Sequence, residues 1–418
     1  MNIAVVLDRF DPDVGGLERW GYQLVKWLVG QGHNVHVVAM EFADRSLALD
    51  ITPHRLQASV SRWRRAAAAE RCLRSLRADV VHDLGTGWYF DVFQPQFGSR
   101  IAGWRQSVLA EPWHRRPLNV LSPRRCRGYW SQRRLETRQL RSPRGVIVAV
   151  SRLVESHLRQ LHGVDPRRIR LVYNGVDTEH FTPARRTTDR PVIRAALGLS
   201  PEDVLFLVAA HNLTLKGAGA ALAAFRHVAA ADPAARLAFI GHGDSRAYRG
   251  AARALGIAER CHFLGFVDDS AKYYSAADVY LHPTFYDACS LAVLEAWASG
   301  LPVITTRLNG AAELAIPGQH GFVVPDPRDV QAVAAAMHQL LNAERRAAIA
   351  GPARTLALAN SSSANFQRIM RVYESVMEQR ARAGADAVAG DPPSARKAPT
   401  DRGAVRLAAT ARPMGNRS

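Results

Sequence analysis

The sequence has little cysteine, little lysine and no long apolar run. Its four cysteines form no Cys-x-x-Cys pair, so we expect free thiols rather than a disulfide or zinc framework. No stretch approaches the ~20 uncharged apolar residues that span a bilayer. The N-terminus leads directly into a predicted strand at residues 3–7, without the basic flank and longer apolar run of a secretory signal. We therefore expect a cytoplasmic protein.

Positive charge is in excess. The formal net charge is +18, and only four of the 55 basic residues are lysine, at positions 26, 216, 272 and 397. A strongly basic surface attracts nucleic acid, anionic lipid or phosphorylated ligands, and charge alone does not choose among them. With 418 residues, 47% of them hydrophobic, the chain is long enough for two domains with a sizeable core in each.

Hydrophobic patterning predicts two α/β domains in series. Apolar β-branched runs at residues 35–39, 80–82 and 146–150 alternate with amphipathic stretches at 17–29 and 63–76, a rhythm typical of a doubly wound sheet. The rhythm restarts with an apolar run from Val204. Two such domains would bind ligands in a cleft at the carboxyl ends of their strands.

Breaks in this pattern predict the domain boundaries. A polar, proline-flanked stretch at 182–191 is interpreted as a linker between an N-terminal domain, 1–181, and a C-terminal domain, 192–360. A final helix is predicted at 361–380. The remaining 381–418 are rich in Ala, Gly, Pro and Arg without periodicity, which predicts a disordered tail.

The segment 286–303 carries the most specific signal. It reads as a loop with Asp287, a short apolar helix with Glu295, and a new strand. Ser290 lies at the predicted N-cap, so the N–H groups of Ser290 and Leu291 are expected to meet a diphosphate. A carboxylate on an apolar helix needs a partner, and ribose hydroxyls would suit Glu295. The alternative is an exposed glutamate on a half-buried helix.

Four further turns give weaker signals. Lys216, after a predicted strand, is a natural phosphate contact or a solvated surface lysine. Gly15 and Gly16 before the first long helix, and Gly241 after a later strand, permit close approach of a ligand or mark plain turns. The backbone at residues 262–266 would bond a flat base edge, although a short core strand fits equally well.

Together these residues resemble the retaining family 4 glycosyltransferases of the GT-B fold, from residue 1 to about 380. The resemblance implies two Rossmann-like doubly wound domains facing across a cleft, with a C-terminal helix returning to the N-terminal domain. It is strongest to bacterial lipopolysaccharide and capsule transferases that work at the inner leaflet.

The resemblance also implies residue roles. The family's Glu-x7-Glu motif falls on Asp287 and Glu295, so Glu295 would bind the donor ribose and Asp287 would lie by the transferred sugar. Its Arg-x4-Lys phosphate pair falls on His211 and Lys216, of which only the lysine is retained. Lys216 and Asp287 are therefore the catalytic candidates.

The remaining donor and acceptor positions follow the same resemblance. Gly15 and Gly16 match the loop beside the diphosphate, residues 306–313 match a further donor-side loop, and the nucleobase pocket matches Phe263 and Leu264. The family often carries an acceptor-side histidine; residues 91–96 hold none, and Asp91 is the acceptor candidate. The implied donor is a nucleotide-sugar substrate, a UDP-sugar, with no cofactor and no metal.

Residues 99–145 form a basic belt. Trp104, Trp113 and Trp130 are interleaved with twelve arginines, against the two acids Glu111 and Glu136. Arginine with tryptophan suits an anionic membrane surface or nucleic acid, and the bland alternative is a solvated helical face. With the family resemblance, we expect a membrane or a lipid-linked or glycan acceptor and no nucleic acid, in a peripheral protein at the inner face of the cytoplasmic membrane.

The predicted function is hexose transfer with retention of configuration in envelope polysaccharide or glycolipid synthesis. Two alternatives stay open. A GT-B sugar-nucleotide epimerase would need no acceptor. A basic nucleic-acid-binding protein on an α/β scaffold would explain the charge but not the segment from Asp287 to Glu295.

Overall fold

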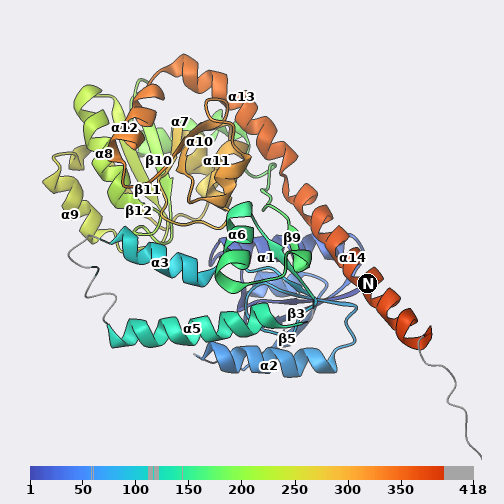
Figure 1. The fold of residues 1–418 in the computed structure, drawn as a ribbon. Helices are drawn as coiled ribbons and strands as arrows, with labels where there is room; N and C mark the ends of the chain where they lie inside the picture. Colours follow the sequence, from blue (N-terminus) through green and yellow to red (C-terminus); the bar gives the residue numbers. More distant parts are fainter. Residues whose placement is uncertain (58, 60, 112–115, 117–121, 144, 390–418) are drawn as a thin grey trace, which may run out of the picture. The chain divides into compact units, whose positions relative to one another are not determined.

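The computed structural model describes residues 1–57, 59, 61–111, 116, 122–143 and 145–389. By its internal contacts the chain divides into two units, residues 1–377 and residues 378–418. The first unit contains two parallel sheets flanked by helices (Figure 1). The predicted class, two doubly wound α/β domains, is confirmed.

The N-terminal sheet is all parallel, in the order β5-β3-β1-β6-β7-β8-β9. Its strands are short, and apart from the exposed, polar edge strand β5 they are largely buried, as expected for a sheet covered on both faces. In chain order they are β1 (Asn2–Val6), β3 (Asn34–Ala39), β5 (Thr52–Arg55), β6 (Val80–Asp83), β7 (Val92–Phe93), β8 (Val146–Ala149) and β9 (Ile169–Leu171). The helices of this half are α1 (Gly16–Gly30), α2 (Arg62–Ser75), α3 (Arg100–Ala110), α5 (Pro123–Arg141) and α6 (Arg152–His162).

The C-terminal sheet is also parallel, in the order β12-β11-β10-β13-β14-β15. Its strands are β10 (Val204–Ala209), β11 (Ala235–Ile240), β12 (Cys261–Gly265), β13 (Val279–His282), β14 (Val303–Thr306) and β15 (Gly321–Val324). Its helices are α7 (Asp189–Ala196), α8 (Ala218–Ala231), α9 (Arg246–Ala254), α10 (Ser270–Ala276), α11 (Leu291–Ala298), α12 (Val330–Gln339) and α13 (Ala343–Ala359). Residues 261–265 thus form an edge strand.

Helix α14 (Ser362–Ala389) returns the chain to the N-terminal domain, as predicted (Figure 1). Its apolar face packs into the core formed by β1, β3 and α1, through Phe366, Ile369, Val372, Tyr373 and Val376. Two hydrogen bonds fix this contact: Tyr373 Oη lies 2.7 Å from His82 Nδ1, and Trp20 Nε1 donates to Asn365 Oδ1 at 3.1 Å.

Two predicted segments differ from the structure. Residues 182–191 are not irregular: they form the 3-10 turn Pro183–Arg186 and the first residues of α7. Arg190 and Arg194 there bind the carboxylate of Asp278 at 2.7 and 3.1 Å, which ties the stretch to the C-terminal domain. The predicted tail begins too early, because residues 381–389 continue α14; residues 390–418 lie outside the described residues.

Candidate active site

The strand order brings Lys216 and Asp287 together. Lys216 follows β10 and Asp287 follows β13, and these strands are neighbours. The chain leaves β10 toward β11 on one side and returns at β13 on the other, which makes this the switch point of the sheet, where open α/β sheets bind ligands. Lys216 Nζ lies 2.5 Å from Asp287 Oδ2 and 3.4 Å from the carbonyl oxygen of Tyr286.

Gly217 makes this approach possible. It has φ 78°, and a Cβ there would lie 1.9 Å from the carbonyl oxygen of Pro283, so a side chain is excluded on both counts. The two loops are also hydrogen-bonded, since the Leu215 carbonyl accepts from Phe285 N at 2.8 Å and from Thr284 Oγ1 at 3.0 Å. The ammonium group of Lys216 is thereby held over the loop that carries Asp287.

Asp287 is an ionised, half-buried carboxylate, with its side chain 15% exposed. Burial acts to raise its pKa, but the Lys216 ammonium and a hydrogen bond from His282 hold the pKa of Asp287 well below its usual range. His282 Nε2 lies 3.1 Å from Asp287 Oδ2, and burial lowers the pKa of His282. A neutral His282 therefore carries its proton on Nε2, because a carboxylate can only accept.

The N-terminus of α11 lies beside this pair in sequence and offers free donors. Ser290 caps it, with Oγ accepting from Val293 N at 3.4 Å. The prediction for Ser290 needs correction, because its own N–H donates to Asn309 Oδ1 at 3.2 Å. Within the described part of the chain, the N–H groups of Leu291 and Ala292 donate to no protein acceptor. A diphosphate here would meet Leu291 and Ala292 rather than Ser290.

Glu295 is half-buried, with its side chain 14% exposed, and has partners, which excludes the exposed-glutamate alternative. Tyr274 Oη donates to its Oε2 at 3.0 Å, and Arg19 Nη1 lies 3.8 Å from its Oε1. Burial raises the pKa of Glu295, while Arg19 acts to lower it. Arg19 lies in the first turn of α1, directly after the two glycines, so it joins the start of this helix to the predicted ribose site.

The glycines predicted to approach a ligand have different local roles. A Cβ at Gly16 would lie 3.2 Å from Leu291 Cδ1, so the start of α1 touches the start of α11. Gly15 precedes it in extended backbone. Gly241 has φ 116°, and a Cβ there would lie 2.3 Å from the Ala210 carbonyl oxygen. Gly241 is thus required for packing of the turns after β10 and β11.

Three aromatic side chains stack on one another beside this site. His211 stacks on His242 at 5.2 Å between ring centroids, and His242 stacks on Phe266 at 4.4 Å. Burial, followed by neighbouring cations, lowers the pKa of His211. His211 therefore lies near Lys216 as a neutral ring rather than as a second phosphate cation.

The predicted nucleobase contacts belong to the edge strand β12. Phe263 packs face to face on Phe239, at 4.8 Å and 4°, and its carbonyl accepts from Arg249 Nη2 at 2.6 Å. Leu264 lies next to it at the sheet edge. The Phe263 carbonyl thus has one of its two lone pairs occupied by Arg249.

The structure places Asp91 on the wrong side of the N-terminal sheet for an acceptor contact. Asp91 precedes β7, at the amino ends of the strands, whereas the cleft faces the carboxyl ends. Asp91 is only 4% exposed, and its carboxylate accepts a hydrogen bond from Val81 N at 2.9 Å. The acceptor prediction for Asp91 is therefore wrong.

Contacts from the N-terminal domain hold the Asp287 loop, and the sequence analysis missed them. Ser99 N donates to Tyr286 Oη at 3.1 Å, Ser151 Oγ to the Ala288 carbonyl at 2.6 Å, and Asn174 Nδ2 to the Cys289 carbonyl at 3.0 Å. Glu313 adds a cap: its carboxylate accepts from the first N–H groups of α6, Arg152 at 2.8 Å and Leu153 at 2.7 Å. Both neighbours of Asp287 are thus fixed by the opposite domain.

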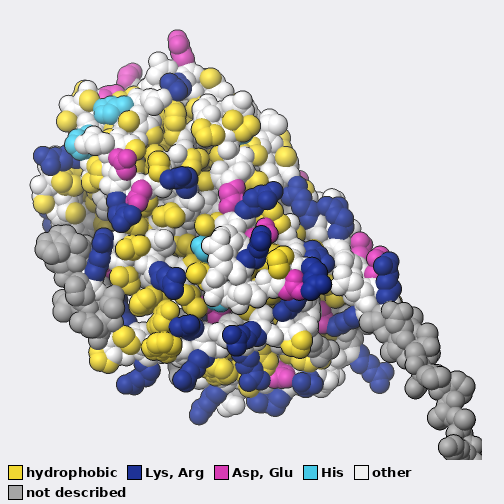
Figure 2. All heavy atoms as spheres, viewed as in Figure 1, with side chains coloured by type: hydrophobic (Ala, Val, Ile, Leu, Met, Phe, Trp, Pro, Cys, Tyr) yellow, Lys and Arg dark blue, Asp and Glu magenta, His cyan; other side chains and the backbone are white. Residues whose placement is uncertain are grey.

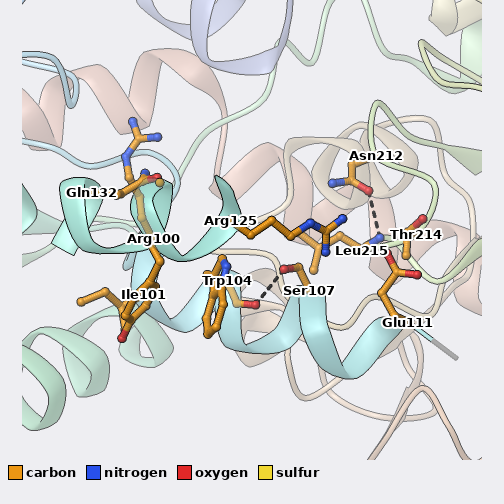
Figure 3. Close-up of a pocket in the computed structure, with 12 residues that line it drawn as sticks. Arg100, Ile101, Trp104, Ser107, Glu111, Arg125, Gln132, Asn212, Thr214 and Leu215 are labelled. Atoms are coloured by element: carbon orange, nitrogen blue, oxygen red, sulfur yellow. Dashed lines mark hydrogen bonds between the residues drawn. The ribbon is translucent and has the colours of Figure 1, made fainter. Parts of the chain in front are cut away.

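A cavity of about 490 Å³ adjoins the Lys216 turn (Figure 3). Helices α3 and α5 form one wall, with Arg100, Trp104, Arg125 and Tyr129 among its side chains. The other wall is the turn after β10, through Asn212, Thr214 and Leu215. The cavity therefore runs from the basic belt to the residue before Lys216.

Within the described residues, no group of three or more His, Cys, Asp or Glu side chains is placed to hold a metal ion. Among these residues, no helix is both long and apolar enough to cross a bilayer.

Two family models match the chain, one in each domain. "Glycosyltransferase Family 4" matches residues 14–180, and "Glycosyl transferases group 1" matches residues 202–343. The chain therefore carries a glycosyltransferase family 4 domain followed by a group 1 glycosyltransferase domain.

Two relatives are similar to this chain over matches of different length. D-inositol 3-phosphate glycosyltransferase 2 of Catenulispora acidiphila is 31% identical over 223 residues, which cover 49% of this chain and 51% of the relative. The chain thus spans about half the length of that curated relative. Lipopolysaccharide glucosyltransferase WaaG of Escherichia coli is 23% identical over 332 residues, covering 78% of this chain and 86% of WaaG.

Solved structures agree on the fold. The crystal structure of WaaG, described as a glycosyltransferase involved in lipopolysaccharide biosynthesis, matches with a TM-score of 0.71 at 21% identity, over 93% of this chain and 100% of WaaG. Anabaena Alr3699/HepE in complex with UDP and glucose matches with a TM-score of 0.65 at 17% identity, over 89% and 99% of the two chains. Both likenesses support the GT-B arrangement.

Proposed function

We propose that this chain transfers a hexose-type sugar from a UDP-sugar to a lipid-linked or glycan acceptor, with retention of configuration, in envelope polysaccharide or glycolipid synthesis. The observation that supports this most is the distance of 2.5 Å between Lys216 and Asp287 at the switch point of the C-terminal sheet, a few residues before the free N–H groups of α11. HepE was solved with UDP and glucose, and WaaG is a lipopolysaccharide glucosyltransferase by name, which supports this donor and acceptor class.

In the proposed reaction the acceptor hydroxyl oxygen forms a bond to the anomeric carbon of the donor. The bond from that carbon to the β-phosphate oxygen breaks, and the diphosphate leaves with the bonding electron pair. The departing diphosphate takes the hydroxyl proton on the face where attack occurs, which gives retention. Lys216 and the N–H groups of Leu291 and Ala292 stabilise the charge that develops on the diphosphate. Asp287 would stabilise positive character at the sugar, and Glu295 would hold the ribose.

The basic surface supports a peripheral position at the inner face of the cytoplasmic membrane. Figure 2 shows Lys and Arg side chains gathered along the margin where α5 and α2 lie in Figure 1. The two helices touch through Arg138 of α5, which lies over the rings of Trp63 and Trp88 at 6.0 and 4.0 Å. The predicted belt therefore extends onto α2. Trp113, Arg115 and Arg144 of the belt lie outside the described residues.

Ligand-induced thermal stabilisation tests the donor class. Binding stabilises a folded protein by mass action, so UDP and its hexose conjugates should raise the melting temperature more than GDP or ADP at equal concentration. Lys216→Ala should reduce that rise. Equal shifts with every diphosphate, or none, would contradict the UDP-sugar proposal. The anomeric coupling constant of the product, read by proton NMR, tests retention.

A further inference from the structure

His282 is a buried histidine behind the Lys216–Asp287 pair. It is the last residue of β13, it is 1% exposed, and it precedes Asp287 by five residues. Its Nε2 lies 3.1 Å from Asp287 Oδ2, and its Nδ1 lies 3.4 Å from Tyr280 Oη. Both ring nitrogens thus have a polar partner, which fixes the orientation of the ring.

The proton positions follow from the charge of Asp287. An ionised carboxylate only accepts hydrogen bonds, so Nε2 of His282 donates to it. Burial lowers the pKa of His282, which keeps the ring neutral and leaves its Nδ1 as an acceptor. The Tyr280 hydroxyl, 3.3 Å from the Ala209 carbonyl oxygen as well, can donate to that Nδ1. Tyr280 therefore supports the tautomer that Asp287 requires.

Packing holds Tyr280 in turn. Tyr280 and Tyr274 are both fully buried, with ring centroids 5.4 Å apart, and Tyr280 stacks on His282 at 5.8 Å and 19°. Tyr274 Oη donates to Glu295 Oε2 at 3.0 Å. A row of three buried rings thus runs behind the site, from Asp287 to Glu295.

The hydrogen bonds to the Asp287 carboxylate are one-sided. Lys216 Nζ and His282 Nε2 both bind Oδ2. Among the described residues, no donor is hydrogen-bonded to Oδ1. Because the Asp287 side chain is 15% exposed, Oδ1 is the oxygen that remains for a ligand.

Donor binding would change this arrangement at Lys216. A diphosphate forms strong charge-assisted hydrogen bonds and would draw the ammonium group toward itself. Asp287 would then lose part of its ion pair, and a half-buried carboxylate without a partner is costly. His282 cannot follow the ammonium group, because its ring is buried and has partners at both nitrogens. His282 is the donor that stays on Oδ2.

We propose that His282 is the positioning residue of Asp287. It holds Oδ2 while Lys216 turns to the diphosphate, so that Oδ1 stays free for the transferred sugar. Tyr280 acts only through His282, by fixing its ring. The inference rests on the proposed transferase function and deepens it, because it assigns the support of one of the two acids.

Transfer kinetics of the full chain test this role, with radiolabelled UDP-hexose and a bacterial membrane extract as the source of acceptor. His282→Leu removes the N–H donor at similar side-chain size. It should lower kcat about tenfold or more and change the donor KM less than about threefold, because the lost hydrogen bond is to a charged group. His282→Gln keeps an N–H donor and should recover most of the loss. His338→Leu, half-buried on α12 of the same domain, is the control and should leave kcat unchanged.

A double-mutant cycle separates positioning from packing. In the Asp287→Asn background, His282→Leu should lower kcat less than about threefold further, because the carboxylate that it holds is already gone. A merely structural role would give the same loss in both backgrounds. Such equal losses, or no recovery in His282→Gln, would overturn the inference.

A readout without turnover tests the same contact. In the full chain labelled with ¹⁵N in its histidine rings, the His282 signal is assigned by its absence in His282→Gln. It should show the neutral Nε2–H tautomer and should shift when UDP draws Lys216 away from Asp287. An Nδ1–H tautomer, or a signal unmoved by UDP at a concentration that raises the melting temperature, would overturn the inference. An Nε2–H tautomer in a chain whose melting temperature does not respond to UDP would instead refute the transferase proposal.

Discussion

The side chains of Lys216 and Asp287 are ion-paired at 2.5 Å, although they come from loops about 70 residues apart in sequence. Both were predicted to act on the donor, one on its diphosphate and one on its sugar. A diphosphate that binds Lys216 must therefore share the ammonium group with Asp287. This sharing couples donor binding to the position of the Asp287 carboxylate.

Removing the Lys216 ammonium should weaken donor binding. We expect Lys216→Ala to lose ~1.5–3 kcal/mol of UDP binding free energy, the usual size of a hydrogen bond to a charged group. Calorimetric titration of UDP measures this loss. Lys272→Ala is the matched control, since Lys272 is exposed on α10 of the same domain. Unchanged UDP affinity in Lys216→Ala would assign the diphosphate to backbone groups instead.

Substitutions of Asp287 and Glu295 should have different effects on kcat and KM. Glu295→Gln removes the charge but keeps the shape, and a ribose contact acts equally in the ground and transition states. Its main effect should be a higher donor KM. Asp287→Asn should lower kcat more than it raises KM, because positive charge develops at the sugar only in the transition state. A kcat left intact in Asp287→Asn would make Asp287 a loop-positioning residue.

Glu313 should contribute to stability across the domains. Its carboxylate accepts two N–H groups at the start of α6, where negative charge is favourable, so Glu313→Gln should lower the free energy of unfolding by ~1 kcal/mol. Urea unfolding followed by circular dichroism measures it. Glu155→Gln is the control: Glu155 also lies in the first turn of α6 but only pairs with Arg159 at 3.7 Å, a surface contact of little value. Equal losses in the two variants would refute the cap.

The basic surface should bind anionic membranes. Co-sedimentation with vesicles should require anionic lipid and weaken as salt rises. Arg127→Glu with Arg134→Glu, both exposed on α5, should abolish it. The charge-matched pair Arg226→Glu with Arg253→Glu, exposed on the C-terminal domain, should not. Equal binding to neutral and anionic vesicles would refute membrane docking.

The fold was predictable because its signals are local. Several buried strands, such as β8 and β14, are β-branched runs, and the face of α14 follows a helical period. The sequence identified Lys216 and Asp287 as candidates but did not predict that they pair. Their contact depends on β10 and β13 being neighbours in the sheet, which no local pattern shows. Arg19 follows the two predicted glycines in sequence. Its contact with Glu295 could not be predicted, because it joins helices from different domains.

Other features left no sequence signal. Ser290 was correctly placed as a helix cap, but its N–H is taken by Asn309, which a spacing argument does not reveal. Asp91 was predicted from its place in the sequence. In the structure it lies at the amino end of β7, away from the carboxyl ends of the strands where the cleft is expected. The cap by Glu313 joins a 3-10 turn to a helix in another domain, and no local pattern marks such a pair.

The most direct measurement follows the donor in a reaction. The full chain is incubated with radiolabelled UDP-hexoses, with and without a bacterial membrane extract as the source of acceptor. We predict UDP release and incorporation of label only when acceptor is present, and loss of both in Asp287→Asn. Conversion of the donor without acceptor, as an epimerase would give, or no UDP release with any donor, would contradict the account.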